Sequence, residues 1–271
     1  MQGTAVTDIL FEKRDGGAFV TFNRPEVRNA LTPEMLLETA NFIAEISTDP
    51  AVRYLVFQGA GEHFVAGGDV ASYGRLLERE PVERRLYFER RVRNNAESFV
   101  LLESLPIPVI SLVRGAAAGA GMSFILASDF VIAADDALLI FAQPRVGLPL
   151  DLSSTYFLPR IVGAKKARQL AFTGARLSAT QARELGLVDQ IHAADALDEA
   201  LAALVKQFAG VAPRAAGRTK LLVNASEENG IVQQMEQEVR AIGQCLNEPD
   251  FAEGVTAFLE KRKAAFTGAG N

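Results

Sequence analysis

The sequence contains few of the residues on which several protein classes depend. There is one cysteine, Cys245, and there are two histidines, His63 and His192, among 271 residues. A single cysteine excludes an internal disulfide framework and is typical of proteins in a reducing compartment, so we expect a cytoplasmic protein. The two histidines are far apart and have no partners at ligand spacing, and the sequence therefore predicts no metal site.

Long apolar runs and concentrated positive charge are also lacking. No apolar run approaches the roughly 20 residues that cross a bilayer, and residues 1–11 have no basic segment followed by an apolar core, as a secretory signal would. The formal net charge is -5, with 28 basic and 33 acidic residues. Basic groups such as residues 261–263 are short and lie among glutamates, so we expect neither a membrane nor a nucleic-acid partner.

Three common catalytic or nucleotide-binding motifs are missing. No serine stands in a G-x-S-x-G pattern, and no G-K-[ST] sequence marks a phosphate loop. The glycines at 119 and 121 lack the third glycine of a dinucleotide fingerprint, because Phe124 stands in its place. These absences argue against a serine hydrolase of that type and against both kinds of nucleotide site.

The order of hydrophobic segments indicates an α/β protein. Segments typical of buried strands alternate with helix-like segments early in the chain, and the later part is helical. We expect a core over residues 1–195 and a helical region over residues 196–271. The expected strands are residues 9–12, 18–22, 54–58, 109–113, 130–133 and 187–191. The expected later helices are residues 195–208, 213–224, 231–246 and 250–266.

Local signals predict where several of these elements begin or turn. Asp15-Gly16-Gly17 between the first two strands predicts a hairpin. Thr32, followed by Pro33 and Glu34, predicts the start of a helix that Thr32 caps. Ser178, with a glutamine three positions later, forms a capping-box pattern at the start of another helix.

Two small-residue segments follow predicted strands and can expose main-chain N–H groups. Residues 64–69 read FVAGGD, and residues 115–121 read GAAAGAG just before an apolar helix expected over residues 122–127. Small residues let a ligand approach the main chain, and the first N–H groups of a helix have no internal partner. Two such groups that converge on one oxygen form an oxyanion hole. Tight packing of a strand against a helix is the alternative interpretation.

Five motifs in chain order resemble those of the crotonase, or enoyl-CoA hydratase/isomerase, superfamily. They are NRPEVRNAL at 23–31, FVAGGD at 64–69, the glycine-rich segment with its closing aspartate at 115–129, FTG through GLV at 172–188, and FLEKR at 258–262. Each motif is weak alone, and together they are specific. The resemblance implies an α/β fold built as a spiral of ββα repeats, a C-terminal helical trimerisation region, and an acyl-CoA thioester as substrate.

The resemblance also implies roles for individual residues. The N–H groups of Gly68 and Ala120 match the oxyanion-hole donors, which hold the thioester carbonyl oxygen as it becomes negative. Arg28 and Lys261 match positions that meet CoA phosphates, although both also fit exposed surface charges. The positions along or near the adenine-side groove are Ala30, Ala66 and Phe258. CoA arrives with the substrate, so no permanently bound cofactor is expected, and the expected assembly is a homotrimer or a dimer of trimers.

The chain departs from the hydratases of this superfamily at both catalytic glutamates. By the resemblance, their positions match Ser123 and Arg145. Arginine stays protonated at any relevant pH, and a serine without a base accepts protons poorly. We therefore do not expect hydration by a glutamate pair.

Asp151 offers a carboxylate elsewhere in the chain. GLPLD at residues 147–151 resembles the G-L-x-P-D segment of superfamily isomerases, including the ring-epoxide and ring-oxepin isomerases of phenylacetyl-CoA breakdown, with the proline one residue early. As a base, Asp151 would remove a proton beside the carbonyl and return it further along the acyl group, and burial would raise its pKa. Alternatively, Asp151 caps a helix that begins near Leu152.

Three functions remain open at this point. The first is an acyl-CoA isomerase that uses Asp151, the second is a hydratase or related lyase with an unconventional base, and the third is a non-catalytic protein that binds acyl-CoA. The acyl group is not specified. Tyr73, Leu76 and Phe88 are candidates for its pocket, and the many charges over residues 78–93 fit a solvated helix face.

Overall fold

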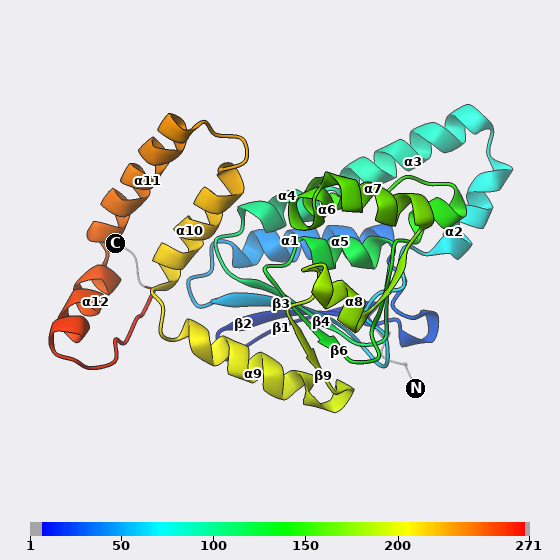
Figure 1. Ribbon diagram of the computed structural model, residues 1–271. Helices are drawn as coiled ribbons and strands as arrows, with labels where there is room; N and C mark the ends of the chain where they lie inside the picture. Colours follow the sequence, from blue (N-terminus) through cyan, green and yellow to red (C-terminus); the bar gives the residue numbers. More distant parts are fainter. Residues whose placement is uncertain (1–6, 269–271) are drawn as a thin grey trace.

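The computed structural model describes residues 7–268 (Figure 1). The strands are β1 (Ile9–Arg14), β2 (Gly17–Phe22), β3 (Tyr54–Gly59), β4 (Val109–Val113), β5 (Ala116–Ala118), β6 (Phe130–Ala134), β7 (Leu138–Ile140), β8 (Arg176–Ser178) and β9 (Gln190–His192). The helices are α1 (Pro33–Ile46), α2 (Val70–Gly74), α3 (Pro81–Asn95), α4 (Glu97–Ser104), α5 (Ala120–Leu126), α6 (Ser154–Val162), α7 (Ala164–Thr173), α8 (Ala179–Glu184), α9 (Leu197–Phe208), α10 (Pro213–Ala225), α11 (Ile231–Leu246) and α12 (Pro249–Leu259). The 3-10 turns are η1 (Pro25–Val27), η2 (Arg75–Glu78), η3 (Gln143–Val146) and η4 (Ala194–Ala196).

Two sheets organise the core. The larger has six strands in the order β1-β2-β3-β4-β6-β9, and the smaller has three in the order β5-β7-β8. In the larger sheet only the β1–β2 pair is antiparallel, and the other neighbours run parallel. Parallel neighbours require long crossover connections, which the helices between them supply. The predicted α/β architecture is therefore confirmed.

The predicted hairpin and helix caps are present. Asp15 and Gly16 both have positive φ, 51° and 75°, which is the backbone that a two-residue type I′ turn needs. The Thr32 side chain accepts a hydrogen bond from the main-chain N–H of Met35 at the start of α1. Ser178 forms the full capping box at α8. These local signals depend on residues a few positions apart, and the sequence predicted them correctly.

Helices cover both faces of the larger sheet. Successive residues of a strand point to opposite faces, so neighbouring residues contact different helices. Phe19 and Val56 pack with the buried residues of α9 on one face. Val20 and Phe57 belong to the main core on the other face, with α1, α4 and α5. Figure 1 shows α9 beneath the sheet and the other three helices above it.

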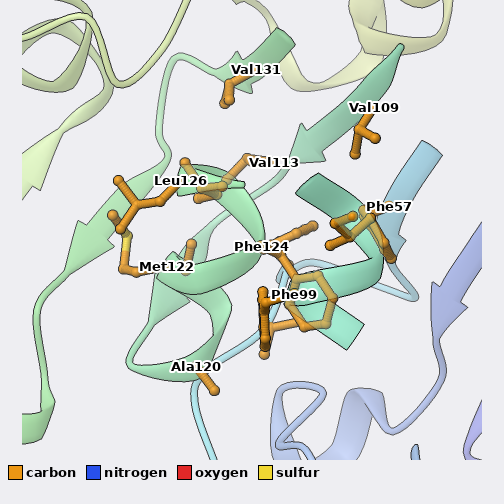
Figure 2. Packing of buried hydrophobic residues seen from close by; sticks show 14 of the residues in the cluster. Phe57, Phe99, Val109, Val113, Ala120, Met122, Phe124, Leu126 and Val131 are labelled. Carbon is orange, nitrogen blue, oxygen red and sulfur yellow. The ribbon is translucent and has the colours of Figure 1, made fainter. Parts of the chain in front are cut away.

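The centre of the main core is Phe124, on α5. Its ring centroid lies 4.8 Å from that of Phe57 on β3, 5.0 Å from that of Phe99 on α4, and 5.1 Å from that of Phe22 on β2. Figure 2 shows the Phe124 side chain close to those of Phe57 and Phe99. Tilted aromatic contacts at these distances add to the hydrophobic burial, so α5 is anchored firmly against the strands.

Most predicted elements agree with the structure to within two residues, and two differ more in their bounds. The strand expected over residues 187–191 is β9, at Gln190–His192, because Leu187 and Val188 are buried in the turn that precedes it. The helix expected over residues 250–266 ends at Leu259. It stops there because the following chain turns back at Lys261, which has a φ of 56°.

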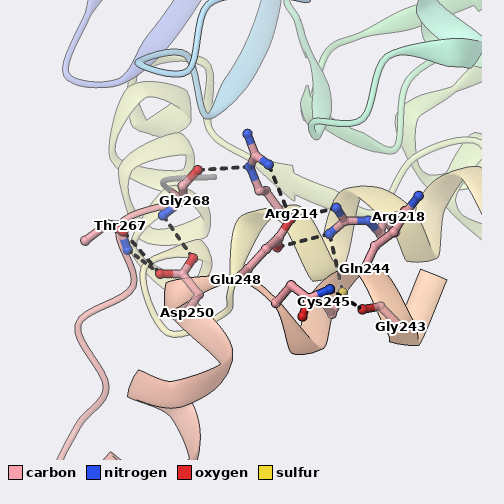
Figure 3. Close-up of polar contacts among 10 residues, drawn as sticks. Arg214, Arg218, Gly243, Gln244, Cys245, Glu248, Asp250, Thr267 and Gly268 are labelled. Carbon is pink, nitrogen blue, oxygen red and sulfur yellow. Dashed lines mark hydrogen bonds and ion pairs between the residues drawn. The ribbon is translucent and has the colours of Figure 1, made fainter. Parts of the chain in front are cut away.

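The chain after α12 is held by main-chain hydrogen bonds to acidic side chains. Asp250, at the start of α12, accepts from the N–H groups of Thr267 and Gly268 at 2.8 and 2.9 Å (Figure 3). Just before α12, Glu248 accepts from Arg218 on α10 at 2.6 Å, and this hydrogen bond lowers the pKa of the Glu248 carboxyl. Helix α12 is thereby tied to α10 of its own chain.

The proposed division at residue 195 stays a prediction. Helix α9 lies after that boundary and yet packs on the sheet, whereas α10, α11 and α12 form an arm at one end of the molecule (Figure 1). The arm joins the core mainly through α10, where Gly217 lies against Pro106 and Lys220 pairs with Asp129 at 2.6 Å. Within residues 7–268, no helix combines the length and apolarity needed to span a membrane.

Candidate active site

The two glycine-containing segments lie side by side. Val65 pairs in parallel with Ala117, and the N–H of Ala118 donates to the carbonyl oxygen of Val65 at 2.8 Å. Beyond this pair, Gly67 (φ 106°) and Gly119 (φ 51°) turn the two segments toward each other. A Cβ on Gly119 would lie 3.5 Å from the Cα of Gly67. Only glycine readily adopts these backbone angles, so the turns depend on both residues.

The residues after these glycines present free main-chain donors. Gly68 follows Gly67, and Ala120 is the first residue of α5. Across residues 7–268, the N–H of neither residue donates to any acceptor, whereas the N–H groups of Gly119 and Asp69 donate to Ile140 and Leu31. Both free amides border the same cavity. The pair therefore places two free donors at one cavity, and their role as an oxyanion hole stays a prediction.

This cavity, of about 100 Å³, also contains Asp151. Its walls come from the segment around Gly68, the start of α5, the turn η3, the loop before α6, and one face of α3. Of the described residues that line it, Asp151 is the only acidic one. The structure thus brings three predicted catalytic residues, distant in sequence, to one partly open cavity.

The Asp151 carboxyl group is partly buried and has one side-chain partner. Gln143 Nε2 donates to Asp151 Oδ1 at 3.1 Å. Burial raises the pKa of the Asp151 carboxyl above its usual range, and the hydrogen bond from Gln143 opposes this rise in part. Gln143 was not singled out from the sequence. Its Oε1 is buried and has no hydrogen-bond partner among the described residues.

The alternative role of Asp151 as a helix cap is wrong. Helix α6 begins at Ser154, and no side chain caps its first turn. Between Asp151 and the helix, Leu152 and Ser153 have φ values of 47° and 70°. Two consecutive residues in this left-handed region are costly for side chains other than glycine. They separate the aspartate from the helix end and leave its carboxylate at the cavity.

Neither residue at the hydratase glutamate positions lines the cavity. The Ser123 hydroxyl is fully buried, forms a 2.9 Å hydrogen bond with the Ser154 hydroxyl, and donates to the main-chain oxygen of Asp151 at 3.4 Å. Arg145 donates through Nε and Nη2 to the carbonyl oxygen of Gly174 at 3.1 and 2.9 Å, at the end of α7. Both residues therefore hold main-chain segments in place.

Three of the predicted CoA-binding residues lie on adjoining segments. The N–H of Ala66 donates to the carbonyl oxygen of Arg28 at 3.0 Å, and the N–H of Leu31 donates to that of Gly67 at 2.8 Å. Ala30 lies between these two contacts. Ala66 borders the cavity, and Arg28 is exposed. This edge is therefore accessible to a ligand that enters the cavity.

The other two predicted CoA-binding residues lie elsewhere. Phe258 is 83% exposed on α12, and Lys261 follows the end of that helix. Figure 1 shows α12 and α2 at opposite ends of the molecule, with α2 carrying the cavity residue Tyr73. A single chain does not bring Phe258 and Lys261 to the cavity.

Asn29 is a structural residue that the sequence analysis quoted only within a motif. Its side chain is fully buried, and its Nδ2 donates to the carbonyl oxygens of Ala60, His63 and Phe64 at 3.0, 2.7 and 3.0 Å. Its Oδ1 accepts from the N–H of Arg24 at 2.9 Å. Asn29 thus joins the NRPEVRNAL motif to the chain leading into residues 64–69, which explains why asparagine suits this position.

Comparison with known proteins gives consistent results. The model of the family described as "Enoyl-CoA hydratase/isomerase" matches residues 12–269. The chain is 34% identical to a crotonyl-CoA hydratase of Syntrophomonas wolfei, over 97% of this chain and 98% of that protein. It is 33% identical to a 1,2-epoxyphenylacetyl-CoA isomerase of Escherichia coli, over 96% of this chain and 98% of that protein.

The fold is also similar to that of solved structures. An enoyl-CoA hydratase from Polaromonas sp. JS666 superposes with a TM-score of 0.88 and 30% sequence identity, covering 95% of this chain and 99% of the other. The crotonase-type fold expected from the motifs is therefore confirmed. The names of the relatives include both hydratases and isomerases, so the comparisons establish the family and leave the reaction open.

Proposed function

Because the chain belongs to the enoyl-CoA hydratase/isomerase family, we propose that it is an acyl-CoA isomerase in which Asp151 moves a proton along the acyl group. The observation that carries this proposal is the composition of the cavity. Asp151 is its only acidic residue within the described part of the chain, and it shares the cavity with two unpaired main-chain amides.

The proposed reaction uses one base and one oxyanion site. The thioester carbonyl oxygen accepts hydrogen bonds from the N–H groups of Gly68 and Ala120. The Asp151 carboxylate removes a proton from the carbon beside the carbonyl, and the resulting negative charge is held at the carbonyl oxygen as an enolate. The protonated Asp151 then returns the same proton further along the conjugated system. No proton is gained or lost overall, so one carboxyl group suffices.

The positions of Ser123 and Arg145 favour isomerisation over hydration. A hydratase must position and activate a water molecule, for which superfamily hydratases use carboxylates at these two positions. Here both side chains are engaged in hydrogen bonds that hold main-chain segments, and neither borders the cavity. A hydratase or related lyase with an unconventional base remains the second candidate, and activity on crotonyl-CoA that survives the loss of Asp151 would favour it.

The proposed formation of an enolate is tested by proton exchange in heavy water. With several short saturated acyl-CoA thioesters, we expect the enzyme to incorporate deuterium at the carbon beside the thioester, because the enolate forms without requiring a double bond. Mass spectrometry measures the incorporation. Tight CoA binding without exchange would instead identify a non-catalytic acyl-CoA-binding protein, and addition of water to crotonyl-CoA would favour the hydratase.

We also propose that Phe258 and Lys261 act at the site of another copy of the chain. The C-terminal arm has many exposed large apolar side chains, and an exposed apolar surface is typical of an interface. They include Ile231, Val232, Met235, Val239, Ile242 and Leu246 on α11, and Phe251, Val255, Phe258 and Leu259 at α12. A trimer or a dimer of trimers would cover this surface and could bring α12 to a neighbouring cavity.

Assembly and CoA contact can be tested together. Light scattering at micromolar concentration should show an oligomer rather than a monomer. Arg28→Ala and Lys261→Ala should each weaken binding of a CoA thioester and reduce its dependence on salt, because exposed contacts between cations and phosphates are screened. Lys166→Ala, at an exposed position on α7 outside the cavity, serves as a control for the loss of a positive charge. A stable monomer, or unchanged affinity of both variants at low salt, would contradict this arrangement.

A further inference from the structure

The α3 wall of the cavity is more polar than an alkyl group would require. Phe88, Arg91, Val92 and Asn95 all border the cavity. Their spacing of three, four and seven positions places them on one face of the helix. The charged residues over 78–93 therefore do not all belong to a solvated face, as the sequence suggested, because Arg91 lies on the cavity side.

Asn95 brings to this wall an amide that has no partner within the described part of the chain. Its side chain is 6% exposed, and no hydrogen bond to it is formed within residues 7–268. The Asn95 amide borders the cavity and is not among the fully buried unpaired groups, so solvent in the cavity can reach it. A ligand group that accepts a hydrogen bond from Asn95 Nδ2 would satisfy it.

Arg91 adds a cation with no acidic partner. Its Nη1 donates to the Ser72 hydroxyl at 3.1 Å, and its guanidinium carbon lies 5.3 Å from the ring centroid of Tyr73 and 6.0 Å from that of Phe88. In the described part of the chain, no carboxylate lies within ion-pair distance of Arg91, since the ion pairs of this protein involve other arginines and lysines. Its planar group can bind a carboxylate through two parallel hydrogen bonds.

Tyr73 connects Arg91 to the oxyanion site. A Cβ on Gly68 would lie 2.6 Å from the Tyr73 hydroxyl, so this hydroxyl adjoins the expected position of the thioester carbonyl. The guanidinium of Arg91 lies against the ring of the same tyrosine. Arg91 is therefore near the reacting end of the ligand.

We propose that the site takes acyl-CoA thioesters whose acyl group carries a second carboxylate, bound by Arg91 and Asn95. This inference rests on the proposed function, because it takes the cavity to be the acyl site. An apolar acyl group would displace water from both polar groups, leaving Asn95 without a partner and Arg91 with only the Ser72 hydroxyl. Sites built around such groups discriminate strongly against ligands that lack the matching atom.

The test compares matched ligands by isothermal titration calorimetry. The ligands are succinyl-, glutaryl- and adipoyl-CoA, and for each an analogue in which an isopropyl group replaces the distal carboxylate. At the best chain length we expect the wild-type protein to bind the carboxylated ligand at least about 10-fold more tightly, as charge-assisted hydrogen bonds allow. Arg91→Met and Asn95→Leu should each reduce this preference, and Arg91→Lys should retain part of it. Arg90→Met, at an exposed position one residue away on α3, should keep it in full.

Three results would overturn the proposal. The first is a wild-type preference for the apolar analogue, or no preference, at every length; this measurement needs no variant, so a folding defect cannot obscure it. The second is a preference that persists in both Arg91→Met and Asn95→Leu. The third is an equal loss of affinity for free CoA in Arg91→Met, which would place Arg91 at the CoA moiety. If the wild-type protein exchanges deuterium but does not prefer the carboxylated ligand, the proposed function is supported and only the proposed substrate class is wrong.

Discussion

Asp151→Asn is expected to lower turnover and α-proton exchange together by at least about 100-fold, the lower end for loss of a general base. Asparagine has nearly the same shape and can still accept the hydrogen bond from Gln143 Nε2, but it cannot accept a proton as a base. Stopped assays with an enoyl-CoA isomerase substrate measure turnover, and mass spectrometry in heavy water measures exchange. Both should fall because the same proton transfer limits both.

The matched control is Asp136→Asn, which removes an exposed carboxylate outside the cavity. It should leave both rates nearly unchanged. Equal activity of Asp151→Asn and wild type would show that Asp151 is not the base. Loss of turnover with retained exchange would instead assign Asp151 to a later protonation step.

The raised pKa of Asp151 has consequences for activity and stability. A base must be ionised, so the exchange rate should fall as pH decreases through the folded-state pKa, which lies above the usual range for aspartate. A raised folded-state pKa means that the native protein binds the proton more tightly than the unfolded chain. Burial of this carboxyl group is therefore destabilising at neutral pH. The destabilisation decreases as pH falls below the folded-state pKa and is absent below the lower pKa of the unfolded chain. Thermal melting at pH 7 should show Asp151→Asn to be at least as stable as wild type.

Ala120→Pro is expected to lower the exchange rate by about 100- to 1000-fold, the usual effect of removing one oxyanion-hole donor. Proline has no main-chain N–H, and its φ suits the first position of a helix, which Ala120 occupies in α5. The substitution thus removes the proposed donor at a position where proline is tolerated. Exchange in heavy water at saturating thioester concentration measures the effect, and thermal melting verifies that the fold is retained.

Ala120→Gly is the control for this variant, because glycine keeps the N–H and removes only a methyl group. Its exchange rate should stay within a few-fold of wild type. If Ala120→Pro folds normally and exchanges protons at the wild-type rate, the main-chain N–H of Ala120 is not a donor to the enolate oxygen. If both variants lose activity equally, the methyl group of Ala120 matters and the missing donor does not.

Local patterns were enough for much of the fold. The turn at Asp15 and Gly16, the Thr32 cap and the capping box at Ser178 each depend on residues within a few positions of one another. Helix α11 has the predicted bounds because its apolar residues recur at helical spacing. The sequence also indicated the importance of Gly67 and Gly119, the glycines that precede Gly68 and Ala120. Small residues allow a ligand to approach the main chain closely, so glycines at such positions suggest a binding site.

Contacts between distant segments were responsible for the remaining features. The pair of free amides requires Gly67 to pack against Gly119, and the position of Asp151 depends on the left-handed backbone at Leu152 and Ser153. The sequence of α3 contains many charged residues and does not indicate which side of the helix faces a cavity. Only the packing of α3 in the folded chain shows this. Hydrophobic periodicity identifies elements, but the neighbours of each face, and hence its burial and pKa values, arise only when the chain is folded.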